Sequence, residues 1–307
     1  MPEVLPQRLM TQQSRAYLYA FAAILCWSTV ASAFKLTLGA TGTGELLLVS
    51  TWTSLMVLAL VAAAQKQLPA LRAWTSNEWR HSALLGILNP FLYYLVLFRA
   101  YDLLPAQEAQ PLNYTWPIVL VLLSALFLGQ RIRWFTMLAM TASFAGVLII
   151  STRGDFTNLH FTSVEGVLLA VGSSLLWGLY WILNMRSKAE QTLKLMTNFL
   201  FGSLYVGIAY IFLPGKEALT TGGLLGGIYV GVFEMGLTFV FWLRALKLSS
   251  NTARVSNLVY LSPFLSLLVI HFVVGEDIYF STITGLLLIV SGIIIQRIGE
   301  GREDVRA

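Results

Sequence analysis

The sequence predicts an all-α integral membrane protein, and two properties of its composition indicate this class. Hydrophobic residues make up 57% of the 307-residue chain and charged residues only 11%, whereas charged residues make up about 25% of an average soluble domain. Apolar runs of about 20 residues, long enough for a helix to cross the hydrocarbon core of a bilayer, recur along the whole sequence. The lipid bilayer is therefore the first partner that we expect.

Cysteine, histidine and motif content argue against several other classes. Cys26 is the single cysteine, and His81, His160 and His271 are scattered, so neither an internal disulfide nor a metal-ligand spacing is present. Hydrolase and phosphate-binding motifs are absent from the sequence, and we expect no enzyme activity and no cofactor. The net charge of +5 follows the membrane pattern described below. We therefore expect no nucleic-acid partner and no obligate protein partner.

Ten apolar stretches are long enough to span a membrane. They cover about residues 16–38, 44–64, 80–101, 106–128, 131–151, 163–185, 193–213, 222–247, 251–273 and 279–298. The first stretch also resembles a signal peptide, because Arg8 and Arg15 precede it and Ala31-Ser32-Ala33 has the small residues of a cleavage site. Its length exceeds that of a signal core, so we interpret it as the first span.

The distribution of lysine and arginine predicts cytoplasmic N- and C-termini. If the N-terminus is inside, only Lys35, Arg99, Arg153 and Lys216 of the 20 basic residues lie outside, and the other sixteen lie inside. Such an excess is typical of cytoplasmic segments. Lys35 and Arg99 fall near span ends, where long side chains can reach the membrane surface, and we expect structural roles for them.

The two halves of the chain repeat a set of residues in the same order. The matching pairs are Trp27 with Trp177, Lys35 with Arg186, Arg99-Ala100 with Arg244-Ala245, Tyr114 and Pro117 with Tyr260 and Pro263, Gly129-Gln130 with Gly275-Glu276, and Gly146 with Gly292. Each half holds five spans, an odd number, so the second half must be inverted relative to the first. We therefore predict two inverted five-helix repeats, residues 1–152 and 153–307, in a single membrane domain.

This arrangement resembles the drug/metabolite transporter superfamily, the EamA-type ten-helix carriers, over essentially the whole chain. The Trp27…Lys35 pattern in the first span carries the resemblance, and the Asn-Tyr-Thr-Trp-Pro run at 113–117 is similar to the YddG-like exporters of aromatic amino acids. The resemblance implies a carrier in the bacterial cytoplasmic membrane that exports aromatic and other apolar amino acids by alternating access. Coupled export of hydrophobic cations and transport of nucleotide sugars or related metabolites are the alternatives.

Prolines in three spans mark a possible substrate path. Pro90 lies in the third span, Pro117 in the fourth and Pro263 in the ninth; an interior proline leaves one carbonyl without its helical hydrogen bond. In a membrane, such breaks lie in protein or beside a water-filled cavity. Polar and aromatic residues near these prolines are therefore candidate substrate-binding residues: Asn89, Tyr93, Tyr94, Asn113, Tyr114, Trp116, Ser256, Asn257 and Tyr260. The alternative is that the prolines only bend helices to fit the bundle.

The sixth span adds Trp177 and Tyr180 on one face of a helix, together with Ser173 and Asn184. Because both aromatic residues lie in the middle of the span, we favour a cavity wall over an interfacial aromatic belt.

Glu234 lies near the centre of the eighth span, after several glycines. A charge there costs about 2.5–3.5 kcal/mol on insertion scales, so such a residue is paired, neutral or functional. Two interpretations remain open: a hydrogen bond that helps the glycine-rich helix to pack, or a role in binding a substrate ammonium group or a proton. Since the first span has no acid, we expect facilitated transport rather than obligatory proton coupling.

Overall fold

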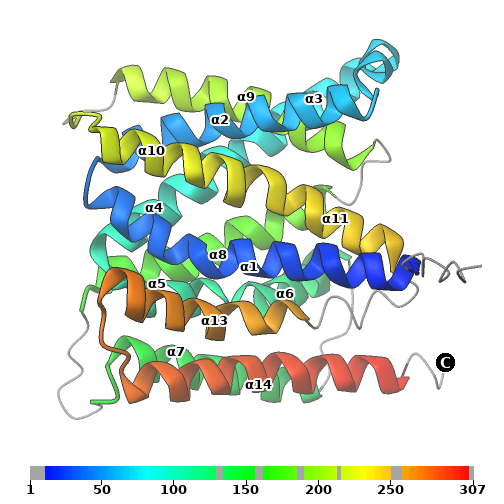
Figure 1. Ribbon diagram of the computed structural model, residues 1–307. Coiled ribbons are helices and arrows are strands. Elements are labelled where there is room, and N and C mark those ends of the chain that lie inside the picture. Colours follow the sequence, from blue (N-terminus) through cyan, green and yellow to red (C-terminus); the bar gives the residue numbers. More distant parts are fainter. Residues whose placement is uncertain are drawn as a thin grey trace, which may run out of the picture.

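The computed structural model describes residues 11–128, 134–155, 162–184, 190–212, 216–249 and 258–303, and within these ranges the elements are helical. Six spans are continuous helices: α1 (Gln12–Leu38), α2 (Thr43–Ala64), α7 (Trp134–Ser151), α8 (Val164–Asn184), α9 (Gln191–Phe212) and α14 (Phe280–Glu303). They run roughly parallel to one another (Figure 1). A short 3-10 turn, η1 (Leu68–Ala73), separates α2 from the third span.

The other four spans are broken, and three of them contain the prolines singled out above. The third consists of α3 (Ser76–Gly86), the π-helical segment η2 (Ile87–Leu92), here called a wide turn, and α4 (Tyr93–Leu103). The fourth consists of α5 (Ala106–Asn113) and α6 (Trp116–Leu128). The eighth consists of α10 (Thr221–Tyr229), the wide turn η3 (Val230–Leu237) and α11 (Thr238–Leu248). The ninth consists of η4 (Leu258–Leu261), α13 (Ser262–Val269) and η5 (Ile270–Val274).

The spans agree in position with the ten that the sequence predicts. In the described residues, seven helices are long and apolar enough to cross a membrane, and three shorter apolar helices, Met137–Ser151, Leu258–Val274 and Phe280–Ile295, occupy the remaining positions. Large apolar side chains project from the outside of the bundle, among them Phe212, 80% exposed, and Phe280, 82% exposed. A water-exposed surface of this kind would favour aggregation, whereas lipid tails solvate it.

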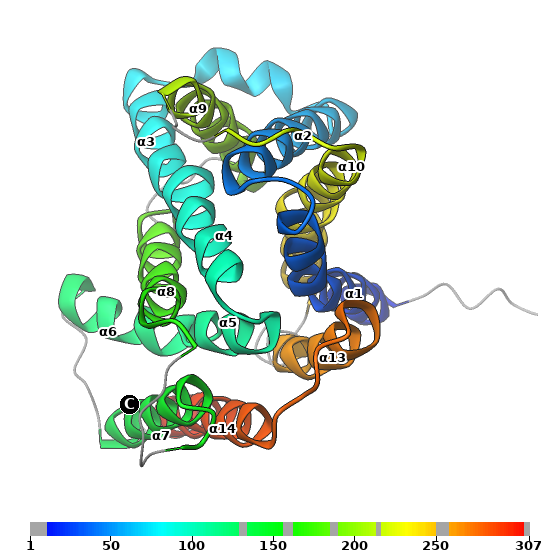
Figure 2. The same cartoon turned by 90° about the vertical axis from the view of Figure 1, so that its left-hand side faces the viewer.

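Helix packing supports the prediction of two related units. The first span packs against the eighth (α1 with α11), and the third against the sixth (α4 with α8); adding five to each span number converts one contact into the other. The fourth–sixth and ninth–first contacts exchange in the same way, while α2 packs on α9 and α7 on α14 (Figure 2). Two units that face each other across a twofold axis give this exchange.

Two matched glycines make the α7–α14 contact possible. A Cβ added at Gly146 would lie 2.5 Å from the Gly285 carbonyl oxygen on α14, and one at Gly292 would lie 2.7 Å from the Ala139 carbonyl oxygen on α7. Each helix thus presents a glycine to the backbone of the other. Small residues permit this close approach in membrane helix pairs.

Candidate substrate site

Five aromatic rings from three spans form a continuous group inside the bundle, here called the aromatic cluster: Tyr93, Tyr94, Trp177, Tyr180 and Phe239. The Trp177 ring centre lies 4.8 Å from that of Tyr93, 5.9 Å from that of Tyr180 and 5.6 Å from that of Phe239. Tyr93 and Tyr94 meet edge to face at 4.7 Å. These separations are in the range of favourable aromatic pairs, so the cluster presents ring faces and edges at the junction of α4, α8 and α11.

The break in the third span places the two tyrosines. Asn89 has extended backbone angles, φ −145° and ψ 119°, just before Pro90, and α4 starts again at Tyr93. Pro90 packs against Gly202 of α9, where no larger residue would fit. Asn89 is fully buried, and its side chain lies beside the Tyr180 hydroxyl.

Amide groups border the cluster. The Tyr93 hydroxyl donates to Asn113 Oδ1 over 3.5 Å, and Asn113 Nδ2 donates to the Ser173 hydroxyl over 2.8 Å. On the far side, Asn198 of α9 donates its Nδ2 to the Tyr180 hydroxyl over 3.2 Å. These groups can exchange their internal hydrogen bonds for bonds to the polar atoms of a ligand.

The two proline breaks of the fourth and ninth spans meet directly. The Tyr114 hydroxyl, in the turn between α5 and α6, donates to the Val259 carbonyl oxygen over 3.3 Å. This is the carbonyl that Pro263, four residues later, leaves without a helical donor. The contact therefore joins the two matched spans across the bundle.

Glu234 lies in the wide turn η3, next to the cluster. Its Oε1 accepts a hydrogen bond from the Tyr94 hydroxyl over 3.2 Å, while its Oε2 is buried and has no hydrogen-bond partner among the described residues. The turn is held from α2, because the Ser54 hydroxyl donates to the Met235 carbonyl oxygen over 2.8 Å. Glu234 itself is only 7% exposed.

The structure brings some of the predicted site residues together and leaves others apart. Seven converge around the cluster: Asn89, Tyr93, Tyr94, Asn113, Trp177, Tyr180 and Glu234. In the part of the chain that the structure describes, no ring contact or hydrogen bond links Trp116 to the cluster. Tyr260 is buried and lies near Tyr114 rather than in the cluster. Ser256 and Asn257 lie outside the described residues, as does the side chain of Pro117.

Two contributors were not predicted. In the sequence, Phe239 is one more apolar residue of the eighth span, whereas Asn198 is an amide in the middle of an apolar stretch. The position of Asn198 in the middle of a span is the signal that could have identified it, since polar residues within a span usually face the protein interior.

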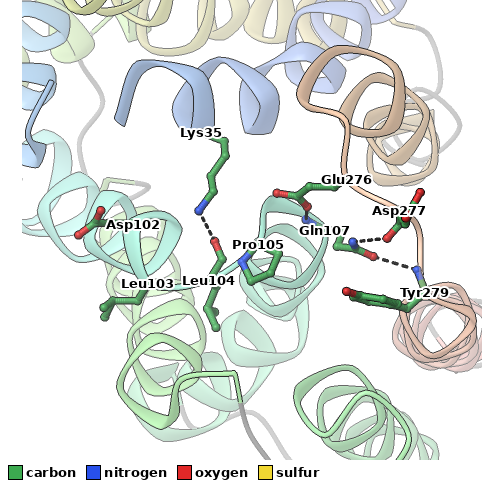
Figure 3. Close-up of a pocket in the computed structure, with 9 residues that line it drawn as sticks. All are labelled: Lys35, Asp102, Leu103, Leu104, Pro105, Gln107, Glu276, Asp277 and Tyr279. Carbon is green, nitrogen blue, oxygen red and sulfur yellow. Dashed lines mark hydrogen bonds between the residues drawn. The ribbon is translucent and has the colours of Figure 1, made fainter. Parts of the chain in front are cut away.

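A second polar region closes one end of the bundle around a pocket of about 280 Å³ (Figure 3). Lys35 Nζ donates to the carbonyl oxygens of Tyr101 and Leu104 over 2.9 and 2.8 Å. Glu276 accepts from the Ala106 and Gln107 backbone N–H groups over 2.9 and 3.1 Å. We call Lys35, Gln107 and Glu276 the polar clasp.

The charges of the clasp match the helix ends that they touch. Lys35 binds the carbonyl end of α4 and Glu276 the amide end of α5, the two pairings that helix dipoles favour. Gln107 ties the same turn to the last connection, because its Oε1 accepts from the Tyr279 backbone N–H over 3.0 Å. Lys35 therefore has the expected structural role, although it points to another helix rather than to the membrane surface.

Metal chemistry has no evident centre here. Among the residues that the structure describes, no group of three or more histidine, cysteine or acidic side chains is placed to hold a metal ion.

Comparison with known families agrees with this architecture. The EamA-like transporter family matches residues 14–152 and, a second time, residues 164–297. The chain belongs to the EamA-like transporter family. It is thus a multi-pass membrane transporter built from two repeats, and the resemblance to EamA-type carriers is confirmed.

Individual relatives are distant but nearly full-length. The chain is 28% identical to the aromatic amino acid exporter YddG of Ancylobacter novellus, over 84% of this chain and 88% of the relative. It is 22% identical to YddG of Escherichia coli, over 92% and 96%, and 25% identical to an uncharacterized transporter, YvbV, of Bacillus subtilis, over 77% of each. A protein of known crystal structure shares the fold, with a TM-score of 0.68, 23% identity and coverage of 94% of this chain and 98% of its own.

Proposed function

We propose that this transporter exports aromatic and other apolar amino acids across a bacterial cytoplasmic membrane by alternating access. The observation that carries the proposal is the aromatic cluster, bordered by Asn89, Asn113 and Asn198. Aromatic pairs contribute about 0.5–1.5 kcal/mol each beyond simple burial, so several rings favour an aromatic side chain over a small one. Two relatives are named as aromatic amino acid exporters, which supports the same substrate class.

We further propose that the two repeats are inverted, that both termini are cytoplasmic and that the substrate gradient alone drives export. A zwitterionic substrate carries no net charge, so no second ion has to move with it to balance charge, and neutral amide groups can donate hydrogen bonds to its carboxylate. The exchange of packing partners between the halves and the excess of basic residues on one side support the topology.

One alternative substrate class fits less well, and another is a second candidate. Nucleotide sugars and phosphorylated metabolites need fixed cations to bind phosphate, and in the described part of the chain no hydrogen bond or ion pair joins a lysine or arginine to the cluster. Hydrophobic cations are the second candidate, because Glu234 places a carboxylate beside the rings.

Transport by purified protein in liposomes tests the proposal. Vesicles are loaded in parallel with L-phenylalanine, UDP-glucose or methyl viologen, and efflux is compared with that from protein-free vesicles. We expect gradient-driven efflux of L-phenylalanine above the protein-free rate, with UDP-glucose retained. Efflux of UDP-glucose or of methyl viologen without efflux of L-phenylalanine would contradict the proposal.

A further inference from the structure

Glu234 differs from two other buried acids, Glu45 and Glu108, in the partners of its carboxylate: among the described residues it has neither a cation nor a backbone donor. Glu45 accepts from the Tyr210 hydroxyl over 2.9 Å and from the Glu217 backbone N–H over 3.0 Å. Glu108 Oε1 is paired with the Arg153 guanidinium at 2.9 Å and accepts from the Thr162 hydroxyl over 3.1 Å, while its Oε2 has no hydrogen-bond partner among the described residues. Glu234 has one neutral donor, the Tyr94 hydroxyl, on one oxygen. Its second oxygen is buried and, among the described residues, has no donor.

No cation in the described structure compensates this carboxylate. Among the described residues, the titratable side chains near Glu234 include a thiol on α1 and phenols on α4 and in the α5–α6 turn: Cys26, Tyr93, Tyr94, Tyr101 and Tyr114. From α2, Ser54 bonds to the backbone of the turn rather than to the carboxylate. A buried carboxylate that no cation compensates is costly, so a bound cation would stabilise this position.

The surroundings define the kind of cation that fits. The carboxylate is joined through Tyr94 to the aromatic cluster, where Tyr93 and Trp177 follow within 5 Å of ring-centre separation. A primary ammonium group offers three hydrogen-bond donors, which suits a free carboxylate oxygen, and ring faces attract such a cation as well. A molecule with an ammonium group two or three bonds from an aromatic ring would match both features.

We propose that Glu234 binds the ammonium group of the transported aromatic amino acid while the aromatic cluster holds its side chain. This inference rests on the proposed function and makes it more specific. Glu234 then determines specificity: compounds that keep the ammonium group are accepted, and ring compounds that lack it bind weakly. The Tyr94 hydroxyl orients the carboxylate by occupying the oxygen that faces α4.

Three probes with the same ring and a similar chain separate the contributions. L-Phenylalanine carries both charges, phenethylamine only the ammonium group, and 3-phenylpropanoate only the carboxylate. Binding of each to the purified full-length protein in nanodiscs is measured calorimetrically for the wild type, for Glu234→Gln and for a control, Glu45→Gln, which alters a buried acid of α2 away from the cluster.

We expect the wild type to bind phenethylamine more tightly than 3-phenylpropanoate. Glu234→Gln should weaken L-phenylalanine and phenethylamine at least tenfold and leave 3-phenylpropanoate unchanged or tighter, with Glu45→Gln close to the wild type. Equal affinities of wild type and Glu234→Gln for L-phenylalanine, or an equal loss for all three probes, would overturn the inference.

The wild-type series also decides the matter if Glu234→Gln does not fold, since tighter binding of 3-phenylpropanoate than of phenethylamine would overturn the ammonium site without any variant. Failure of the proposed function has a different signature. Binding of phenethylamine but not of L-phenylalanine would contradict amino-acid export while supporting an amine site at Glu234.

Discussion

The polar clasp and the aromatic cluster use charged groups in opposite ways. In the clasp, Lys35 and Glu276 are each bonded to two backbone groups of the α4–α5 turn, although a pocket of about 280 Å³ opens beside them. Beside the cluster, Glu234 keeps one carboxylate oxygen unbonded within the described structure. We therefore infer the substrate site from chemistry rather than from hollow shape: at Glu234 a buried carboxylate, without a cation among the described residues, lies beside aromatic rings.

The largest effect is expected from removing a ring of the cluster. Trp177→Ala removes the ring that contacts Tyr93, Tyr180 and Phe239, and with it a surface on which the substrate ring can pack. A loss of about 1.4 kcal/mol of contact between substrate and protein is a tenfold change in affinity. We expect L-phenylalanine efflux from liposomes, at equal protein content, to fall at least tenfold at low substrate concentration.

The matched control for that substitution is Trp52→Ala, which removes an indole that is 43% exposed on α2. It should transport like the wild type. A similar loss in both variants would mean that tryptophan removal damages the bundle in general, and the distinction between cluster and surroundings would fail.

Breaking the clasp should lower stability rather than substrate affinity. Lys35→Met removes the donor of two carbonyls whose residues, Tyr101 and Leu104, are buried, and a buried group left unsatisfied costs about 1–3 kcal/mol. We expect a lower thermal unfolding midpoint in detergent, measured by tryptophan fluorescence, with L-phenylalanine affinity within twofold of the wild type. An unchanged midpoint would show that the clasp does not contribute to the stability of the fold.

The position of the clasp relative to the membrane can be determined by labelling. With Cys26 replaced by serine, Asp277→Cys places a thiol in the connection beside the clasp. The predicted topology puts this connection outside, so a membrane-impermeant maleimide should label it in intact cells. Labelling only after the membrane is opened would contradict the inverted arrangement.

The smallest effect is expected from a pH gradient. Substrate is placed at equal concentration on both sides of the liposome membrane, a pH step is imposed with the potential clamped, and net movement is followed. If the substrate gradient alone drives export, the wild type should show no accumulation. Uphill accumulation that disappears in Glu234→Gln would instead assign a coupling proton to that carboxylate.

Much of the fold follows from residues that act locally. Apolar length predicts the ten span positions, and the prolines predict three of the four breaks. The carbonyl that Pro263 is expected to free, that of Val259, is the one that accepts from Tyr114. The direction of Lys35 could not be predicted, because snorkelling and binding to another helix need the same long side chain at a span end. Because α1 packs beside α4, Lys35 reaches carbonyl groups at the end of α4 rather than the membrane surface.

The candidate site was predictable where residues lie next to a break and less so elsewhere. Tyr93 and Asn113 flank breaks, and the structure joins them. Phe239 lies on α11 directly after the wide turn η3 and contacts Trp177, and this turn contains no proline that would mark it in the sequence. The role of Trp116, close to a break but apart from the cluster, remains a prediction.

Equilibrium binding of radiolabelled L-phenylalanine to Trp177→Ala and Lys35→Met, measured side by side in nanodiscs below either unfolding midpoint, tests the central claim most directly. If the cluster binds substrate and the clasp only stabilises the fold, Trp177→Ala loses at least tenfold in affinity and Lys35→Met stays within twofold of the wild type. The opposite ranking, with binding lost in Lys35→Met and retained in Trp177→Ala, would place the substrate at the clasp pocket and contradict the account.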